Sequence, residues 1–112
     1  MYLSTELFPR LGIADQIRDK IRKIIADPVG SVVANGEFEI GFQQISELRP
    51  VKGIDIVGEL PAGAQSVTVF AAGIPAAAEH PNEAGALIRW LGSEAAHAII
   101  RKTGLEPAVS KP

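Results

Sequence analysis

The side chains that most often carry out chemistry in proteins are few in this sequence. It contains no cysteine, which excludes disulfides, thiolate nucleophiles and thiolate metal sites. The two histidines, His80 and His97, are well separated, and neither has a histidine or carboxylate nearby at the spacing of metal ligands. We therefore expect no metal and no other cofactor. Since no nucleophile has a base at a suitable spacing, we also expect a protein that is not an enzyme.

One polar segment has the character of a binding site. Gln43, Gln44 and Ser46 directly follow an alternating apolar segment, residues 38–42, that is typical of a strand. Asp27 and Pro28 have the residue types of an N-cap and a first helical position. In open α/β sheets, ligands gather beyond the carboxyl ends of strands, near helix N-termini whose free N–H groups favour anions. The alternative, that the glutamines only cap a loop, stays open.

The charge balance argues against a nucleic-acid partner. Thirteen acidic and eleven basic residues give a net charge of -2, whereas phosphate contacts need a concentrated basic face. The one basic cluster has acidic residues among its members and is typical of the solvated face of a helix. It comprises Arg18, Lys20, Arg22 and Lys23, interspersed with Asp15 and Asp19.

The length of 112 residues is typical of one domain, and its elements alternate between helix and strand. Helices are predicted over residues 15–25, 27–36, 81–91 and 93–103. Strands are predicted over residues 38–42, 54–57 and 67–72. This alternation predicts the α/β class. The longest apolar stretches are too short to span a membrane, and the first six residues lack the features of a secretory signal.

From Asp27 onward, the order of these features resembles a known family. Residues 32–42 resemble the segment "helix, Gly-Glu-Ala-Glu, Ile-Gly-Phe" of the bacterial solute-binding proteins of ABC importers, most of all the subgroup that contains the molybdate and tungstate binders. Further matches follow in the same order at residues 57–61, 68–72, 84–91, 93–96 and 103–107. Each match is weak alone, and the ordered set over most of the chain is fairly specific.

The resemblance implies part of a periplasmic-binding-protein fold of the second type, which has two three-layer α/β/α lobes that close on a ligand. It implies that this chain is one partial, truncated domain corresponding to the C-terminal half. Residues 1–60 would form part of the second lobe and the crossover. Residues 61–112 would form the return strand and the C-terminal helices of the first lobe.

The same resemblance implies a ligand site and its partners. Backbone groups at Ala26, Asp27 and Pro28 would contact an oxyanion. Gln44 stands where molybdate binders place a tyrosine, with Gln43 and Ser46 beside it. This departure weakens the case for molybdate itself and leaves a small oxyanion or similar polar solute.

The function implied is that of a solute-binding component, or a remnant of one, of an ABC importer. It would be periplasmic and would present its solute to an ABC permease, although the absence of an export signal in this sequence also fits a cytoplasmic protein. We expect a homo-oligomer through the face left by the missing lobe, with no nucleic-acid partner and no membrane insertion. The alternative is the ligand-sensing effector domain of a cytoplasmic transcription regulator, which shares this fold.

Overall fold

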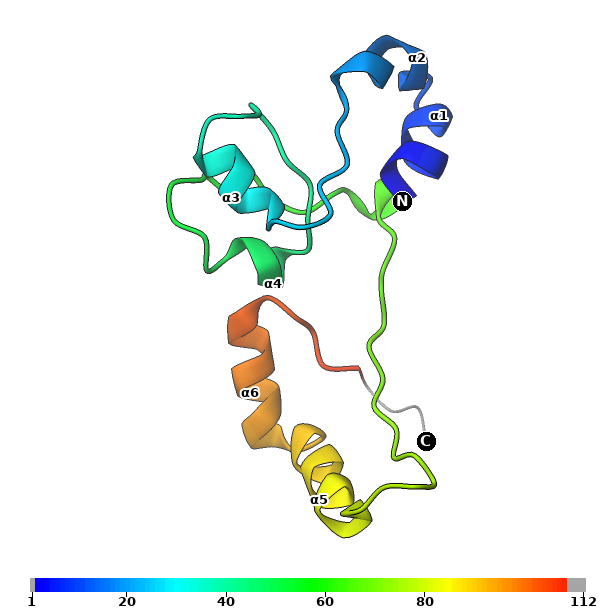
Figure 1. Cartoon of the computed structure of the whole chain (residues 1–112), viewed down its shortest axis with the longest axis vertical. Helices are drawn as coiled ribbons and strands as arrows, with labels where there is room; N and C mark the ends of the chain where they lie inside the picture. The colour runs from blue at the N-terminus through cyan, green and yellow to red at the C-terminus, as the bar shows by residue number, and fades with distance from the viewer. Residues whose placement is uncertain (1, 109–112) are drawn as a thin grey trace.

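The protein is elongated in its computed structural model, which describes residues 2–108 (Figure 1). Its principal extents are 52 × 31 × 28 Å and its radius of gyration is 17.9 Å, whereas a compact domain of this length has a radius of gyration of about 13 Å. The buried apolar side chains of the described residues, Leu7, Phe8, Val32 and Ala96, lie on different elements and do not make one continuous core.

The chain begins with four short helical elements. They are η1 (Leu3–Leu7), α1 (Phe8–Arg10), α2 (Ala14–Ile17) and η2 (Arg18–Lys20). Phe8 is buried and meets the ring of Phe42 edge-on, with the ring centroids 6.2 Å apart. The hydroxyl of Tyr2 donates to the carbonyl of Ala64 at 3.1 Å. These contacts hold the first helices against segments far along the chain.

The helix predicted over residues 15–25 is shorter than expected. Helical structure ends at Lys20, and Ile21 is extended, with φ -83° and ψ 134°. An amphipathic helix draws most of its stability from packing its apolar face, but Ile21 and Ile25 are exposed. The second half of the predicted helix therefore has no surface to pack on.

The middle of the chain holds two short helices, α3 (Val29–Ala34) and α4 (Ile45–Leu48). Helix α3 begins later than predicted: Pro28, with φ -59° and ψ 129°, is the N-cap in place of Asp27. The extended ψ of Pro28 turns the chain before the helix, so the Asp27 side chain does not cap it. Gly36 has the predicted left-handed conformation after this helix, with φ +79°.

No strand is present in residues 2–108. The segments 38–42, 54–57 and 67–72, all predicted as strands, have no regular secondary structure. An alternating pattern predicts which side chains share a face, but a strand also needs a neighbour that accepts and donates its backbone hydrogen bonds. None of the three segments has such a neighbour among the described residues.

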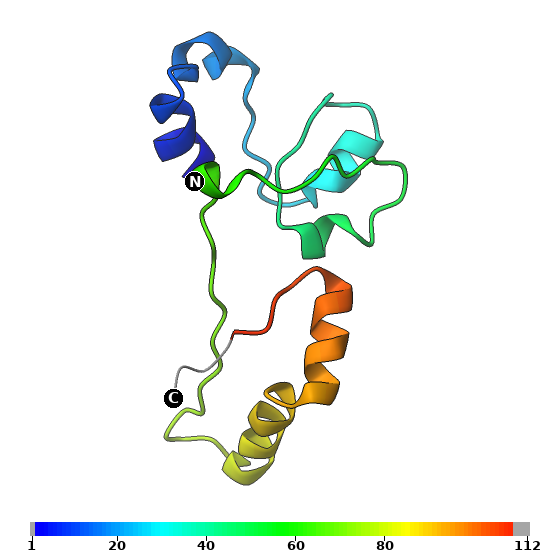
Figure 2. The same cartoon turned by 180° about the vertical axis from the view of Figure 1, so that it is seen from behind.

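The C-terminal helices agree with the prediction. They are α5 (Pro81–Leu91) and α6 (Glu94–Thr103), which pack against each other (Figure 2). The Ser93 hydroxyl accepts the Ala96 N–H at 3.3 Å, as an N-cap does. Gly104 ends α6 in the left-handed conformation, with φ +94°.

The end of α6 lies against α4, as both views of the ribbon show. Nη1 of Arg49 donates to the carbonyls of Arg101 and Lys102, at 3.3 and 2.7 Å. An added Cβ at Gly104 would lie 2.6 Å from Cγ2 of Ile45. These contacts connect the C-terminal helices to the middle of the chain. Across the described part of the chain, no helix has the length and apolar character needed to span a bilayer.

Candidate functional site

Gln43 connects the two short helices in the middle of the chain. Its Oε1 accepts the N–H of Val29, the first residue of α3, at 3.1 Å. Its Nε2 donates to Oε2 of Glu47 on α4 at 3.0 Å. One carboxamide therefore satisfies a free N–H of α3 and holds a carboxylate of α4 in place. The segment after residue 42 is brought beside the segment after Pro28, as the sequence predicts.

A hollow of about 730 Å³ lies between α3, α4 and the loop that follows α4. Its polar lining combines two hydroxyls, an amide, a carboxylate and an ammonium group. Proline, alanine and valine complete the wall. The lining residues are Pro28, Ser31, Ala34, Asn35, Ser46, Glu47, Pro50, Val51 and Lys52.

Two glycines pack closely where α3 meets the segments around it. A Cβ added at Gly30 would lie 3.0 Å from Cγ2 of Val51 and 3.2 Å from Cδ1 of Ile54. One added at Gly41 would lie 2.6 Å from a methyl group of Val29. Helix α3 thus touches the segments on either side of it so closely that these positions admit only glycine without displacement.

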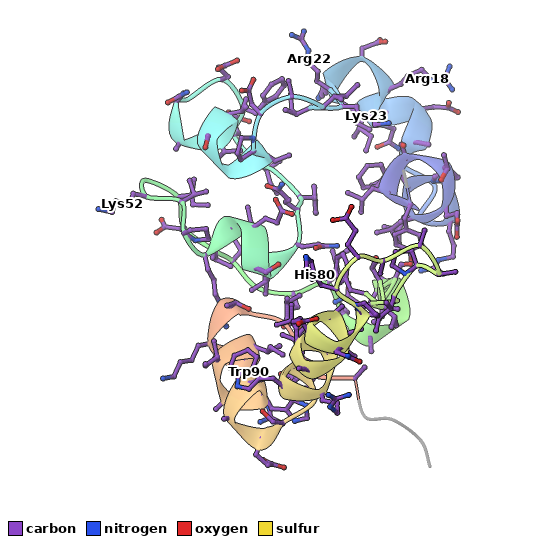
Figure 3. All side chains as sticks on the ribbon, turned by 60° about the horizontal axis from the view of Figure 1, so that its bottom comes forward. Arg18, Arg22, Lys23, Lys52, His80 and Trp90 are labelled. Atoms are coloured by element: carbon purple, nitrogen blue, oxygen red, sulfur yellow. The ribbon has the colours of Figure 1, made fainter. Side chains whose placement is uncertain are left out.

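The charges of the hollow balance. Glu47 supplies one negative group and Lys52 one positive group, and both side chains are exposed. Lys52 lies at the outer edge of its loop (Figure 3). The lysine can attract a carboxylate of a ligand, while the hydroxyls of Ser31 and Ser46 can both donate and accept. This arrangement suits a small polar molecule with several oxygen atoms.

The six predicted site residues have different places in the structure. Pro28 and Ser46 line the hollow, and Gln43 forms the bridge described above. Gln44 is the N-cap residue of α4 and is exposed. Ala26 and Asp27 precede α3 and are exposed without lining the hollow. Their role in ligand binding stays a prediction.

Seven lining residues were not among the predicted site residues, and four of them, Ser31, Asn35, Glu47 and Lys52, are polar. Ser31 and Asn35 are four residues apart, and on a helix this spacing places two side chains on one face. Their pattern could have been recognised once α3 was assigned. Lys52 is in a loop, where position along the sequence says little about spatial neighbours.

The basic cluster near the N-terminus has local partners. Arg18 forms an ion pair with Asp15, and the guanidinium of Arg22 lies 5.7 Å from the ring centroid of Phe38. The labelled side chains around α2 and η2 point in different directions (Figure 3). Because helical structure ends at Lys20, Arg22 and Lys23 do not share the predicted helix face with Arg18 and Lys20. That the cluster binds no nucleic acid stays a prediction. Among residues 2–108, no group of three or more His, Cys, Asp or Glu side chains is placed to hold a metal ion.

The comparisons with known proteins identify a family and one relative. Residues 2–106 match the profile of a family described as bacterial extracellular solute-binding protein. An aconitate isomerase of Pseudomonas sp is 45% identical over all 112 residues of the chain. The chain spans 43% of the length of that relative. No solved structure shows significant similarity to the chain.

These findings confirm the predicted solute-binding family and correct one expectation. The expectation of a protein that is not an enzyme is wrong, because the relative at 45% identity is named as an enzyme. Neither comparison names molybdate. The family agrees with the α/β class, although the described residues form helices without strands. The division into lobes at residues 60 and 61 stays a prediction.

Proposed function

This chain belongs to the bacterial extracellular solute-binding proteins, and from that membership we propose that it forms a site for a small organic polycarboxylate and takes part in isomerising it. The observation that carries the proposal is the 45% identity, over the whole chain, to a protein named aconitate isomerase. The ligand we propose is therefore aconitate or a similar tricarboxylate, in place of molybdate. A location outside the cytoplasm is part of the same proposal.

The polar groups of the hollow suit such a ligand. The side chains of Ser31, Ser46 and Lys52 offer donors to carboxylate oxygens. Three hydrogen bonds to a charged ligand contribute about 5–9 kcal/mol, from which the loss of ligand freedom subtracts about 4 kcal/mol or more. The remainder of at most about 1–5 kcal/mol corresponds to a Kd between about 0.2 mM and about 0.2 M. We expect the hollow, acting alone, to bind in that range.

Isomerisation of aconitate requires a base and no redox partner. Aconitate has one carbon–carbon double bond, one CH₂ carbon and three carboxylates. A base can remove a proton from the CH₂ carbon, the double bond then shifts by one position, and the proton returns to the former vinyl carbon. Glu47 is the carboxylate that lines the hollow, and Gln43 orients it at 3.0 Å. We assign the transfer of this proton to Glu47.

Proton NMR in D₂O tests the proposal directly. The full 112-residue chain is incubated with millimolar cis-aconitate, and the vinyl signals of the two geometric isomers are followed. We expect the trans signal to grow, deuterium to enter the carbon skeleton, and Glu47→Gln to abolish both. Glu39→Gln is the matched control, because Glu39 is exposed and does not line the hollow.

A chimera supplies the second arm of the test. This chain replaces the matching residues of the Pseudomonas relative, and isomerase activity is measured in the longer protein. If the chimera folds and has no isomerase activity, the isomerase role is refuted, whether or not the 112-residue chain was also inactive. If line broadening shows aconitate bound but unchanged in both proteins, the chain is a binding protein only. If sulfate or molybdate binds and aconitate does not, the polycarboxylate assignment is wrong.

A further inference from the structure

The segment 66–74 is extended and exposed, and its backbone forms no hydrogen bond with any other residue in the range 2–108. It connects η3 (Ala62–Ala64) to the C-terminal helices (Figure 1). Its large apolar side chains face solvent: Val67 is 80% exposed, Val69 73% and Phe70 66%. A row of free N–H and C=O groups flanked by such side chains is the form of an unpaired strand.

The composition of this segment favours pairing with another strand. Residues 66–74 contain two valines, a threonine and a phenylalanine, which are good strand formers. Residues 60–78 contain no charged side chain. Proteins protect exposed strand edges with lysine, other charges or proline, and here the prolines stand outside the segment, at Pro61 and Pro75.

The exposed area indicates how large the missing partner surface is. The chain exposes 9291 Å², about 3,400 Å² more than the roughly 5,900 Å² expected for a folded protein of its mass. Obligate dimers bury about 2,000–5,000 Å² counted over both copies, which is about 1,000–2,500 Å² of each copy. The excess area of one chain is therefore large enough to supply its side of such an interface, and a second copy would cover part of it. A two-stranded ribbon alone is marginal in water, so the rest of the contact must come from other surfaces.

The C-terminal helices offer that additional surface. The side chains of Leu87, Trp90, Leu91 and Ile99 on α5 and α6 are all exposed. These helices lie at the same end of the molecule as the extended segment (Figures 1 and 2). A paired ribbon has two faces, and one of them can pack on these side chains.

We propose that two copies of this chain associate by antiparallel pairing of residues 66–74 about a two-fold axis. An uncharged segment opposite its own copy brings no like charges together. Two-fold pairing closes on itself and gives a dimer instead of an open polymer. The pairing supplies each copy with the neighbour that the predicted strand over residues 67–72 lacks. This inference does not rest on the proposed function, because the segment lies outside the hollow.

Size-exclusion chromatography with light scattering measures the mass of the protein, and hydrogen exchange measures the protection of its amides. Together they test the pairing. At 100 µM we expect the mass of a dimer, and the amides of residues 66–74 should be protected. On dilution, the mass and the protection should fall together. Val69→Lys should weaken dimerisation at least tenfold, because pairing would bring two ammonium groups together. Val57→Lys is the matched control, since Val57 is 98% exposed and lies outside the segment.

Several outcomes would overturn the proposal. A monomer at every concentration would mean that another chain, or none, covers this segment. A dimer with unprotected amides at 66–74, or one weakened equally by Val57→Lys, would place the interface elsewhere. Soluble species larger than a dimer would exclude closed two-fold pairing. Val69 makes no buried contact, so circular dichroism of Val69→Lys should match that of the original chain.

Discussion

Gly104 joins the C-terminal helices to the middle of the chain, and replacing it with alanine probes that junction. Its φ of +94° lies in the left-handed region, which costs an alanine about 1–2 kcal/mol. The added Cβ would also lie 2.6 Å from Cγ2 of Ile45 and 3.2 Å from the backbone nitrogen of Ser46. Neither atom is the free end of a flexible side chain. The helix end must therefore move away from α4.

Gly36→Ala is the matched control, because Gly36 has a similar φ of +79° and nothing within 4 Å of an added Cβ. Overpacking costs about 1–3 kcal/mol, and only Gly104→Ala carries this cost in addition to backbone strain. We expect a loss of about 2–5 kcal/mol for Gly104→Ala and about 1–2 kcal/mol for Gly36→Ala. The difference corresponds to a factor of about 5 to 150 in the opening equilibrium.

Hydrogen exchange followed by mass spectrometry can locate these losses. Both variants are measured at one protein concentration, because association changes apparent stability. Gly104→Ala should accelerate exchange in α4 and α6 together, whereas Gly36→Ala should accelerate it around α3. If both variants leave α6 equally protected, the close packing of Gly104 on α4 is not part of the folded protein, and the reasoning fails.

Three further predictions concern single polar contacts. Ser93→Ala removes the N-cap of α6 and should lower the stability of that helix by about 0.5–2 kcal/mol, measured by urea denaturation; Ser93→Asp should restore most of it. Gln43→Ala frees the N–H of Val29 and the carboxylate of Glu47, so the Val29 amide should exchange faster, and an unchanged rate would contradict the bridge. Arg49→Ala removes two hydrogen bonds to the end of α6 and should destabilise that helix end by about 1–2 kcal/mol, seen as faster exchange there and no change in α3.

The helices with local start and stop signals could be predicted from the sequence. Helix α5 has Pro81 in its first turn, and α6 has Ser93 before it and Gly104 after it. Each of these signals acts within a few residues, through a fixed φ, a side-chain cap or a left-handed exit. The structure therefore agrees with the predicted ends of both helices. The left-handed exit at Gly36 after α3 was predicted correctly for the same reason.

Elements that depend on distant partners could not be predicted in the same way. The alternating segment 38–42 has the composition of a strand, but its pairing depends on a neighbour that sequence pattern does not supply. Residues 21–25 have the spacing of an amphipathic helix, but Ile25 has nothing to pack against. In both cases the pattern describes a face, and the element forms only when another surface covers that face.

The candidate site also combines features that local sequence predicts with features that depend on distant contacts. Gln43 and Ser46 follow a predicted element and were assigned to the site from the residues around them. The structure adds the bridge from Gln43 to Val29, which joins residues 14 positions apart. Lys52 is at the rim of the hollow, next to Val51, on which Gly30 packs. That contact depends on the shape of the backbone in three dimensions, which a single sequence does not specify.

The proposed ligand site and the proposed pairing segment are separate parts of the molecule, so the result of one test does not decide the other. The hollow is built from residues 28–52, whereas the pairing segment begins after η3. Arg10 and Tyr2 fasten η3 to the first helices through the carbonyls of Gly63 and Ala64. A change at Val69 should therefore not reach the hollow through the fold. If weakening the dimer also weakened aconitate binding, the ligand would have to contact both copies, and the hollow would be one part of a site completed across the pair.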